Sequence, residues 1–131
     1  QAVISETAVP SPINSVDVFN DGVLRMKVIT LADYQQFSSD KMKKNNLFQT
    51  ERFFCDIYCL EPGQEQKGHV HGHQDKVYIV IEGQGTFQVG TEQRVLEVGQ
   101  GTMASAGQEH GVKNHTSGRL SVLVFVAPNP S

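Results

Sequence analysis

The stretch that decides the fold is residues 63–83, GQEQKGHVHGHQDKVYIVIEG. Three of the five histidines of the chain stand here at alternate positions: His69, His71 and His73. In an extended segment, residues two apart point to the same side, so these rings begin on one face of a strand. Neutral imidazole is a common ligand of first-row transition metals, and the spacing therefore indicates a metal site. The alternative is a polar loop of solvated histidines.

A second stretch, residues 99–114, makes the pattern more specific. In the first stretch Pro62-Gly63 is followed, after five residues, by His69-Val70-His71, and later by Tyr78 and by Glu82-Gly83. In the second stretch Gly99 is followed by Ser105-Ala106-Gly107, then His110, then Asn114. Together, in this order and with a short gap between them, the two stretches resemble the two motifs of the cupin superfamily.

The resemblance implies an all-β fold, the antiparallel double-stranded β-helix or jelly-roll barrel. It also implies one divalent transition metal near the centre of the barrel, either Fe, Mn, Ni or Zn, with His69, His71 and His110 as its ligands. Cupins include dioxygenases, isomerases, epimerases, lyases and non-enzymatic binders, so the resemblance does not name a reaction.

The chain departs from the family pattern at the fourth ligand, which is usually a glutamate. Counting forward from His71 places Asp75 at that position, and counting back from Gly83 places Lys76 there. Asp75 is a candidate fourth ligand with a shorter reach, whereas the ammonium of Lys76 has no lone pair to give. We therefore expect three histidine ligands, with water or substrate in the open positions. Ser105 replaces a usual proline, which affects a turn rather than a ligand.

Strand-like segments independently favour a sandwich or barrel, because they are short and are separated by glycine-rich turns. Residues 47–60 predict one long strand with Cys55 and Ile57 on one face and Asp56 and Tyr58 on the other. Residues 77–81 predict a strand buried on both faces. Further strands are expected at 23–30, 86–89, 93–98 and 120–127, with a hairpin around 90–92 and one or two helical turns within 31–46.

The length of 131 residues is that of a single domain. We expect an N-terminal arm over residues 1–20, able to lie as a strand on a partner subunit, and a barrel over 21–131; a homodimer is the expected assembly. The net charge of −3 offers no basic face for nucleic acid. No apolar run reaches the roughly 20 residues of a membrane span, and no secretory signal opens the chain. Cytoplasm is the default expectation, although the chain begins with Gln.

Cys55 and Cys59 are four residues apart in a predicted strand, which separates their Cα atoms by about 13 Å, too far for a disulfide. We expect buried free thiols; the alternative is a thiol that lines the pocket. Lys41, Lys43 and Lys44 form either a solvated surface or the rim of a site for an anionic ligand.

Candidates for acid–base chemistry near the predicted metal are Tyr58, Tyr78, His73, Asp75 and Glu109. We assign Tyr78 and Asp75 as the catalytic candidates, with a core-packing role as the alternative for Tyr78. We expect His73 either to support a ligand or to face solvent, Glu109 and His115 to lie at the surface, and Asn114 to serve a structural turn. For Gln66 the pocket wall is the less favoured of its readings.

The functional hypothesis is a small metal-dependent cupin enzyme that acts on a small organic substrate, as an oxygenase or as an isomerase or lyase. The alternatives are a non-catalytic barrel that binds or senses a small ligand, and a metal-free structural cupin.

Overall fold

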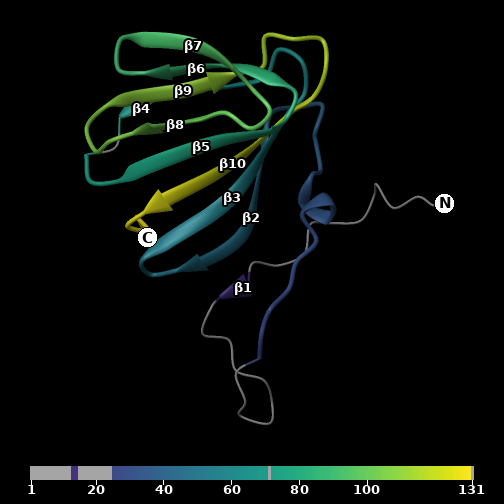
Figure 1. Cartoon of the computed structure of the whole chain (residues 1–131), viewed down its shortest axis with the longest axis vertical. Helices are drawn as coiled ribbons and strands as arrows, with labels where there is room; N and C mark the ends of the chain where they lie inside the picture. The colour runs from purple at the N-terminus through teal and green to yellow at the C-terminus, as the bar shows by residue number, and fades with distance from the viewer. Residues whose placement is uncertain (1–12, 15–24, 71, 131) are drawn as a thin grey trace, which may run out of the picture.

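In a computed structural model, the protein is described over residues 13–14, 25–70 and 72–130. Most of the described chain is β-strand (Figure 1). The strands are β1 (Ile13–Asn14), β2 (Lys43–Thr50), β3 (Phe53–Leu60), β4 (Glu65–Val70), β5 (Asp75–Glu82), β6 (Gln84–Val89), β7 (Glu92–Glu97), β8 (Gly101–Ala104), β9 (Glu109–Lys113) and β10 (Leu120–Ala127). One 3₁₀ turn, η2 (Leu31–Tyr34), precedes β2.

Two sheets form the layers of the barrel. The larger sheet has the order β1-β2-β3-β10-β5-β8, and the smaller has the order β4-β9-β6-β7. All pairings are antiparallel except that of β1 with β2. Neighbours in a sheet that are far apart in sequence, such as β3 and β10, give the double-stranded β-helix that the motifs imply. The predicted fold class is therefore confirmed.

The main core lies between the two sheets and is made by the inward-facing residues of β3, β5 and β10 in the larger sheet and of β6 and β9 in the smaller one. It consists of Tyr58, Leu60, Tyr78, Val80, Phe87, Val112, Leu120, Val122, Val124 and Val126. In β10, alternate residues supply this core, as the pleat of a strand requires. The predicted strand 120–127 has the observed bounds.

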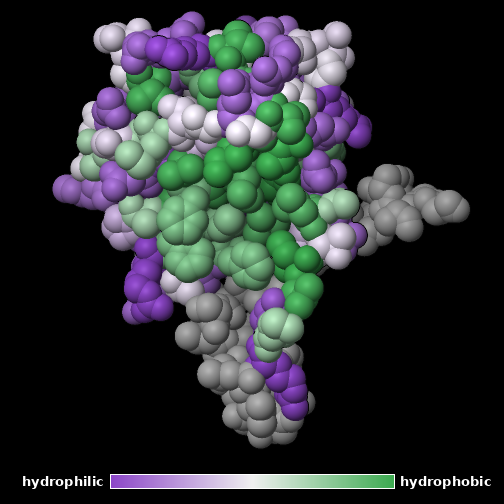
Figure 2. All heavy atoms as spheres, viewed as in Figure 1, coloured by the Kyte–Doolittle hydropathy of each residue, from purple (hydrophilic) through white to green (hydrophobic). Residues whose placement is uncertain are grey.

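A second, smaller core lies on the outer face of the larger sheet. Tyr34, Leu47, Ile57 and Cys59 form it, with Ile29, Leu31 and Phe37 packed against it. Residues 29–37 therefore cover part of this face as a strap. The rest of the face is apolar and open, and Figure 2 shows it as a continuous hydrophobic area.

Three strand predictions need correction. Residues 25–30 form no strand, since they pair with no strand and only Ile29 among them packs against the outer core; residues 23–24 lie outside the described residues. The long strand at 47–60 is two strands, β2 and β3, joined by a turn at Glu51 and Arg52. The outer face of β5 is not buried, since Ile79 is 38 % exposed.

Other predictions of local structure are confirmed. The two faces of β3 separate as expected, with Cys55 and Ile57 in the outer core and Tyr58 in the inner one. Both cysteines are free thiols. Of the predicted arm, Ile13–Asn14 pairs with β2 of the same chain, and the remainder lies outside the described residues. Among the residues that the structure describes, no helical segment has the length and hydropathy that a membrane crossing needs.

Candidate metal centre and its buried lysine

Two of the three predicted histidine ligands lie side by side. His69 in β4 and His110 in β9 are register partners across the smaller sheet. Their ring centroids are 4.3 Å apart and the ring planes are inclined at 60°. His110 is only 2 % exposed, and the ring of Tyr78 meets it edge-on at 6.3 Å. The two motifs therefore converge on one place in the barrel, as the resemblance implies.

The tautomer of both rings follows from their backbone contacts. Nδ1 of His69 lies 2.9 Å from the carbonyl oxygen of Lys67, and Nδ1 of His110 lies 2.9 Å from that of Gln108. A carbonyl oxygen only accepts, so each Nδ1 carries the proton. In a neutral ring the lone pair is then on Nε2, which is the arrangement of a metal-binding histidine. This donor set fits a divalent transition metal.

A β-bulge in β4 turns Gln66 and His69 to the same side. Gln66 pairs with Val112 and His69 with His110, so three steps along β4 match two along β9. Without the extra residue, positions three apart would point to opposite faces. Gly111 makes the bulge possible, because a Cβ there would stand 2.7 Å from the carbonyl oxygen of Gln66 and 2.9 Å from the amide nitrogen of Gly68.

Four buried polar side chains form a hydrogen-bonded cluster inside the barrel. Lys76 Nζ donates to Tyr58 Oη at 2.9 Å and to Gln66 Oε1 at 3.1 Å. Tyr78 Oη donates to Gln66 Oε1 at 3.0 Å, and Gln66 Nε2 donates to Tyr58 Oη at 3.1 Å. All four side chains are at most 9 % exposed. Lys76, one of the two residues that counting places at the usual glutamate, is therefore a buried member of a polar network.

Burial controls the electrostatics of this cluster. The pKa of Lys76 is lowered from 10.5 to about 7, chiefly because burial disfavours the charged amine and also because Lys44 is nearby, while Asp56 acts in the opposite direction. Burial also raises the pKa values of Tyr58 and Tyr78. Both phenols consequently stay protonated at neutral pH and do not act as bases.

Asp75, the predicted fourth ligand and catalytic candidate, lies elsewhere. It precedes Lys76 in β5 and so points to the opposite side of the strand. Its side chain is exposed, and Oδ1 accepts a hydrogen bond from the backbone nitrogen of Ala106 at 2.9 Å. Asp75 therefore stabilises the turn after β8 and is not among the proposed metal ligands.

The remaining predicted residues are placed as follows. His71 lies outside the described residues, and within those residues no three His, Cys, Asp or Glu side chains form a metal-binding group. The residues expected at the surface, His73, Glu109 and His115, are exposed. Asn114 is fully buried and has the structural role expected of it, because it bonds the backbone of Leu60, Thr116 and Gly118.

Lys76 is the site residue that reasoning from the sequence dismissed. Its ammonium could not serve as a ligand, and no other role was assigned to it. One signal was present, since Lys76 alternates with Tyr78 and Val80 and therefore faces the core when residues 77–81 form a strand. The pocket wall was the less favoured reading for Gln66, and the bulge that turns it inward has no clear signature in the sequence.

Comparison with known protein families identifies the family of this chain. Residues 56–126 match the Cupin domain family. The chain belongs to the cupin superfamily. The matched segment runs from β3 to β10 and includes both histidine motifs and Lys76.

Several solved structures have the same fold. TT1209 from Thermus thermophilus is 41 % identical, with a TM-score of 0.78 over 80 % of this chain and 100 % of that one. An RmlC-like cupin from Desulfovibrio desulfuricans is 26 % identical, with a TM-score of 0.70 over 79 % and 98 %. A predicted oxalate decarboxylase from Thermotoga maritima, at 18 % identity and a TM-score of 0.63 over 66 % and 79 %, shares the fold alone. The search of curated proteins returned no match.

Proposed function

We propose that this cupin is a small metal-dependent enzyme that acts on a small organic molecule at a divalent transition metal held by His69, His71 and His110. The observation that carries the proposal is the adjacency of the His69 and His110 rings, both with Nδ1 bonded to a backbone carbonyl. A metal with three protein ligands retains open coordination positions, where it polarises a carbonyl or lowers the pKa of a bound water.

The residues around the proposed metal position supply the rest of the chemistry. Tyr78 packs against His110 and donates its hydrogen bond to Gln66, so as a neutral phenol it fixes both side chains beside the proposed metal position. Lys76 supplies a cation where most relatives have an anionic ligand. The apolar core residues around the cluster exclude water from it.

Both reaction classes, oxygenase and isomerase or lyase, are compatible with this arrangement. The alternative function is a barrel that binds or senses a small ligand without turnover. Lys76 supports this alternative. A site without the usual carboxylate ligand has one protein ligand fewer for the metal, which weakens the case for catalysis.

Metal analysis of protein purified without a histidine tag tests the proposal. We expect close to one equivalent of a transition metal in the wild type and a large loss in the double variant His69→Ala/His110→Ala. The variant should keep its far-UV spectrum, since the barrel is held by its apolar cores. The matched control is His73→Ala, an exposed histidine of the same stretch, which should keep the metal.

Absence of metal from wild-type protein that has been incubated with Fe, Mn, Ni and Zn would refute the proposal. If metal binds, oxygen uptake and product analysis with flavonols, diketones and thiols separate the enzyme from the binder. Metal binding without product from any substrate of either reaction class would favour the binding function.

A further inference from the structure

We propose that the buried cluster of Lys76, Tyr58 and Gln66 recognises a carboxylate, so that the ligand of this barrel is a small organic acid. The inference rests on the proposed function in one respect, since it names the ligand class of the same site. It is drawn from the hydrogen bonds and charges of the cluster, and it does not require the metal to be bound.

The hydrogen bonds of the cluster leave donors unmatched. An ammonium has three N–H donors, and Lys76 uses two of them on Tyr58 and Gln66. The phenolic oxygen of Tyr58 accepts from both Lys76 and Gln66, and no acceptor is found for its own proton among the described residues. One donor of Lys76 and one of Tyr58 therefore remain to be met by an acceptor.

The orientation of Gln66 is fixed by the same contacts. In its charged form Lys76 only donates, so the atom of Gln66 that faces the ammonium is the oxygen Oε1. That oxygen also accepts from Tyr78 and so has both lone pairs in use. The amide therefore cannot meet the remaining donors, and they are left to a ligand that brings its own acceptor oxygens.

The charges of the interior favour an anionic acceptor. Among the described residues, the buried Lys, Arg, Asp and Glu side chains are those of Lys76 and Asp56. Asp56 is engaged by Asn46 Nδ2 at 2.7 Å, and no ion pair joins it to Lys76 in the described structure. Lys44 adds a second cation, with Nζ 5.6 Å from the centre of the Tyr58 ring, while Lys76 Nζ is 4.9 Å from the same centre. A carboxylate would provide two acceptor oxygens and the missing negative charge.

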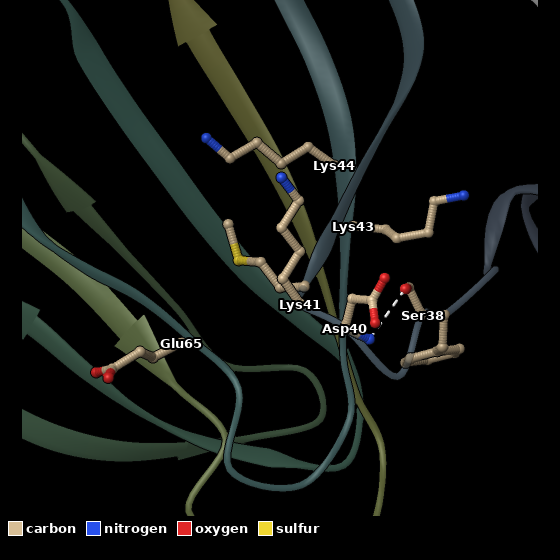
Figure 3. A pocket seen from close by; sticks show the side chains of 8 residues that line it. Ser38, Asp40, Lys41, Lys43, Lys44 and Glu65 are labelled. Atoms are coloured by element: carbon tan, nitrogen blue, oxygen red, sulfur yellow. Dashed lines mark hydrogen bonds between the residues drawn. The ribbon is translucent and has the colours of Figure 1, made fainter.

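An open cleft of about 830 Å³ is lined by Lys44, whose amine lies over the ring of Tyr58. Lys41, Lys44 and Met42 line the cleft, and Met42 also packs against the inner core that contains Tyr58 and Tyr78. Figure 3 shows that the side chains of Lys41 and Lys44 extend to one side, whereas that of Lys43 points to the other. Asp40 and Glu65 are the acidic residues of the lining. Lys44 thus belongs to both the cleft and the cation pair around Tyr58.

The test is a titration of the metal-free protein with malonate, and with malonamide as the neutral match. Tyrosine emission reports the binding, because the chain has three tyrosines and no tryptophan; calorimetry gives the affinity. We expect saturable binding of malonate and at least about tenfold weaker binding of malonamide, as for the loss of a charge-assisted hydrogen bond.

Substitutions in the cluster test whether it is the site of malonate binding. Lys76→Met and Tyr58→Phe should each weaken malonate binding, the first by about tenfold or more, since a hydrogen bond to a charged group is lost. Lys44→Met should weaken it less. Lys43→Met is the matched control in the same cleft, and its affinity should equal that of the wild type. Circular dichroism verifies that each variant is folded.

Equal affinity of wild type, Lys76→Met and Tyr58→Phe for malonate would overturn the inference, and so would equal binding of malonate and malonamide. Tighter binding of inorganic phosphate than of malonate would overturn the assignment to a carboxylate. Metal analysis of the same samples separates the two proposals. Malonate binding that depends on Lys76 in a protein that takes up no metal refutes the proposed function alone, whereas metal uptake with no effect of Lys76 refutes the inference alone.

Discussion

The amine of Lys76 lies 2.9 Å from the phenolic oxygen of Tyr58 in the interior of the barrel. In the part of the first motif where the resemblance implies a glutamate ligand, the amine of Lys76 lies over two aromatic rings, 4.9 Å from the centre of Tyr58 and 5.1 Å from that of Tyr78. Three neutral imidazoles and a divalent metal would leave the site with a positive charge. The replacement therefore changes the charge of the molecule that the site can accept.

The first prediction concerns the pH dependence of stability in the metal-free protein. The pKa of Lys76 is lowered from 10.5 to about 7 on folding, so the unfolded chain binds more protons between these values. The free energy of unfolding gains a contribution that rises with pH over this window, about 5 kcal/mol in total at ~1.4 kcal/mol per pKa unit. Below pH 7 the cost of the buried ammonium is present in full.

Urea unfolding of wild type and Lys76→Met at pH 7 and pH 9 measures this contribution. Relative to Lys76→Met, the wild type should gain about 2 kcal/mol between the two pH values. Cys59, whose pKa burial raises to about 11, opposes the trend in both proteins and cancels in the difference. The control is Lys113→Met, at an exposed lysine, whose free energy of unfolding should change with pH as that of the wild type does. A difference between wild type and Lys76→Met that is constant with pH would contradict the prediction.

The second prediction concerns the bulge opposite Gly111. Gly111→Ala would place a Cβ within 3.0 Å of the backbone of Gln66 and Gly68, and backbone atoms cannot rotate away. We expect a loss of about 1–3 kcal/mol in the free energy of unfolding, as for an overpacked core. Metal affinity should fall as well, because the bulge sets the direction of His69.

Gly118→Ala is the matched control, since no atom lies within 4 Å of its added Cβ. Thermal unfolding and metal titration of both variants provide the measurement. A Gly111→Ala protein with the stability and metal affinity of Gly118→Ala would show that β4 can accommodate a regular register.

The sequence was sufficient to predict the barrel and the convergence of two motifs, because alternation and glycine-rich turns are local signals. The strand 120–127 and the two faces of β3 follow directly from the period of two. Residues 25–30 also alternate, yet they form no strand, and only Ile29 among them packs against the outer face of the sheet. Whether an alternating segment joins a sheet edge or covers a face depends on distant partners, which periodicity does not encode.

The site was predicted less completely than the fold. His69 and His110 are register partners, as the resemblance implies, but Asp75 points away from Lys76 because neighbouring residues of a strand face opposite sides. The role of Gln66 depends on a bulge in β4, and that of Lys76 on a network contributed by β3, β4 and β5. Such networks arise only when separate strands meet.

The third prediction concerns Asn114, which ties three backbone segments together. Its side chain donates to the carbonyl oxygens of Leu60 and Gly118 and accepts from the amide of Thr116. Asn114→Ala leaves the buried carbonyl of Leu60 without this donor, and we expect a loss of about 2–3 kcal/mol. Thr116→Ala removes one hydroxyl at the periphery of the same network and should cost less. Equal melting temperatures for Asn114→Ala and wild type would refute the structural role.

The expected homodimer remains a prediction, and the open part of the larger sheet is where we expect it to form. Cys55, Phe125, Val77 and Met103 stand in register across β3, β10, β5 and β8 on the outer face. Phe125 is 41 % exposed and stacks on Phe53 with ring centroids 5.1 Å apart. A contiguous apolar area of this kind is uncommon on a monomer and typical of an interface (Figure 2).

The fourth prediction is that Phe125→Glu converts a dimer into a monomer, because a carboxylate at the centre of the area would be buried without a partner. Sedimentation equilibrium should give twice the mass of one chain for the wild type and the mass of one chain for the variant. Val95→Glu, at an exposed valine of β7 in the other sheet, should remain dimeric. A monomeric wild type would refute the homodimer, and a dimeric Phe125→Glu would place the interface on another surface.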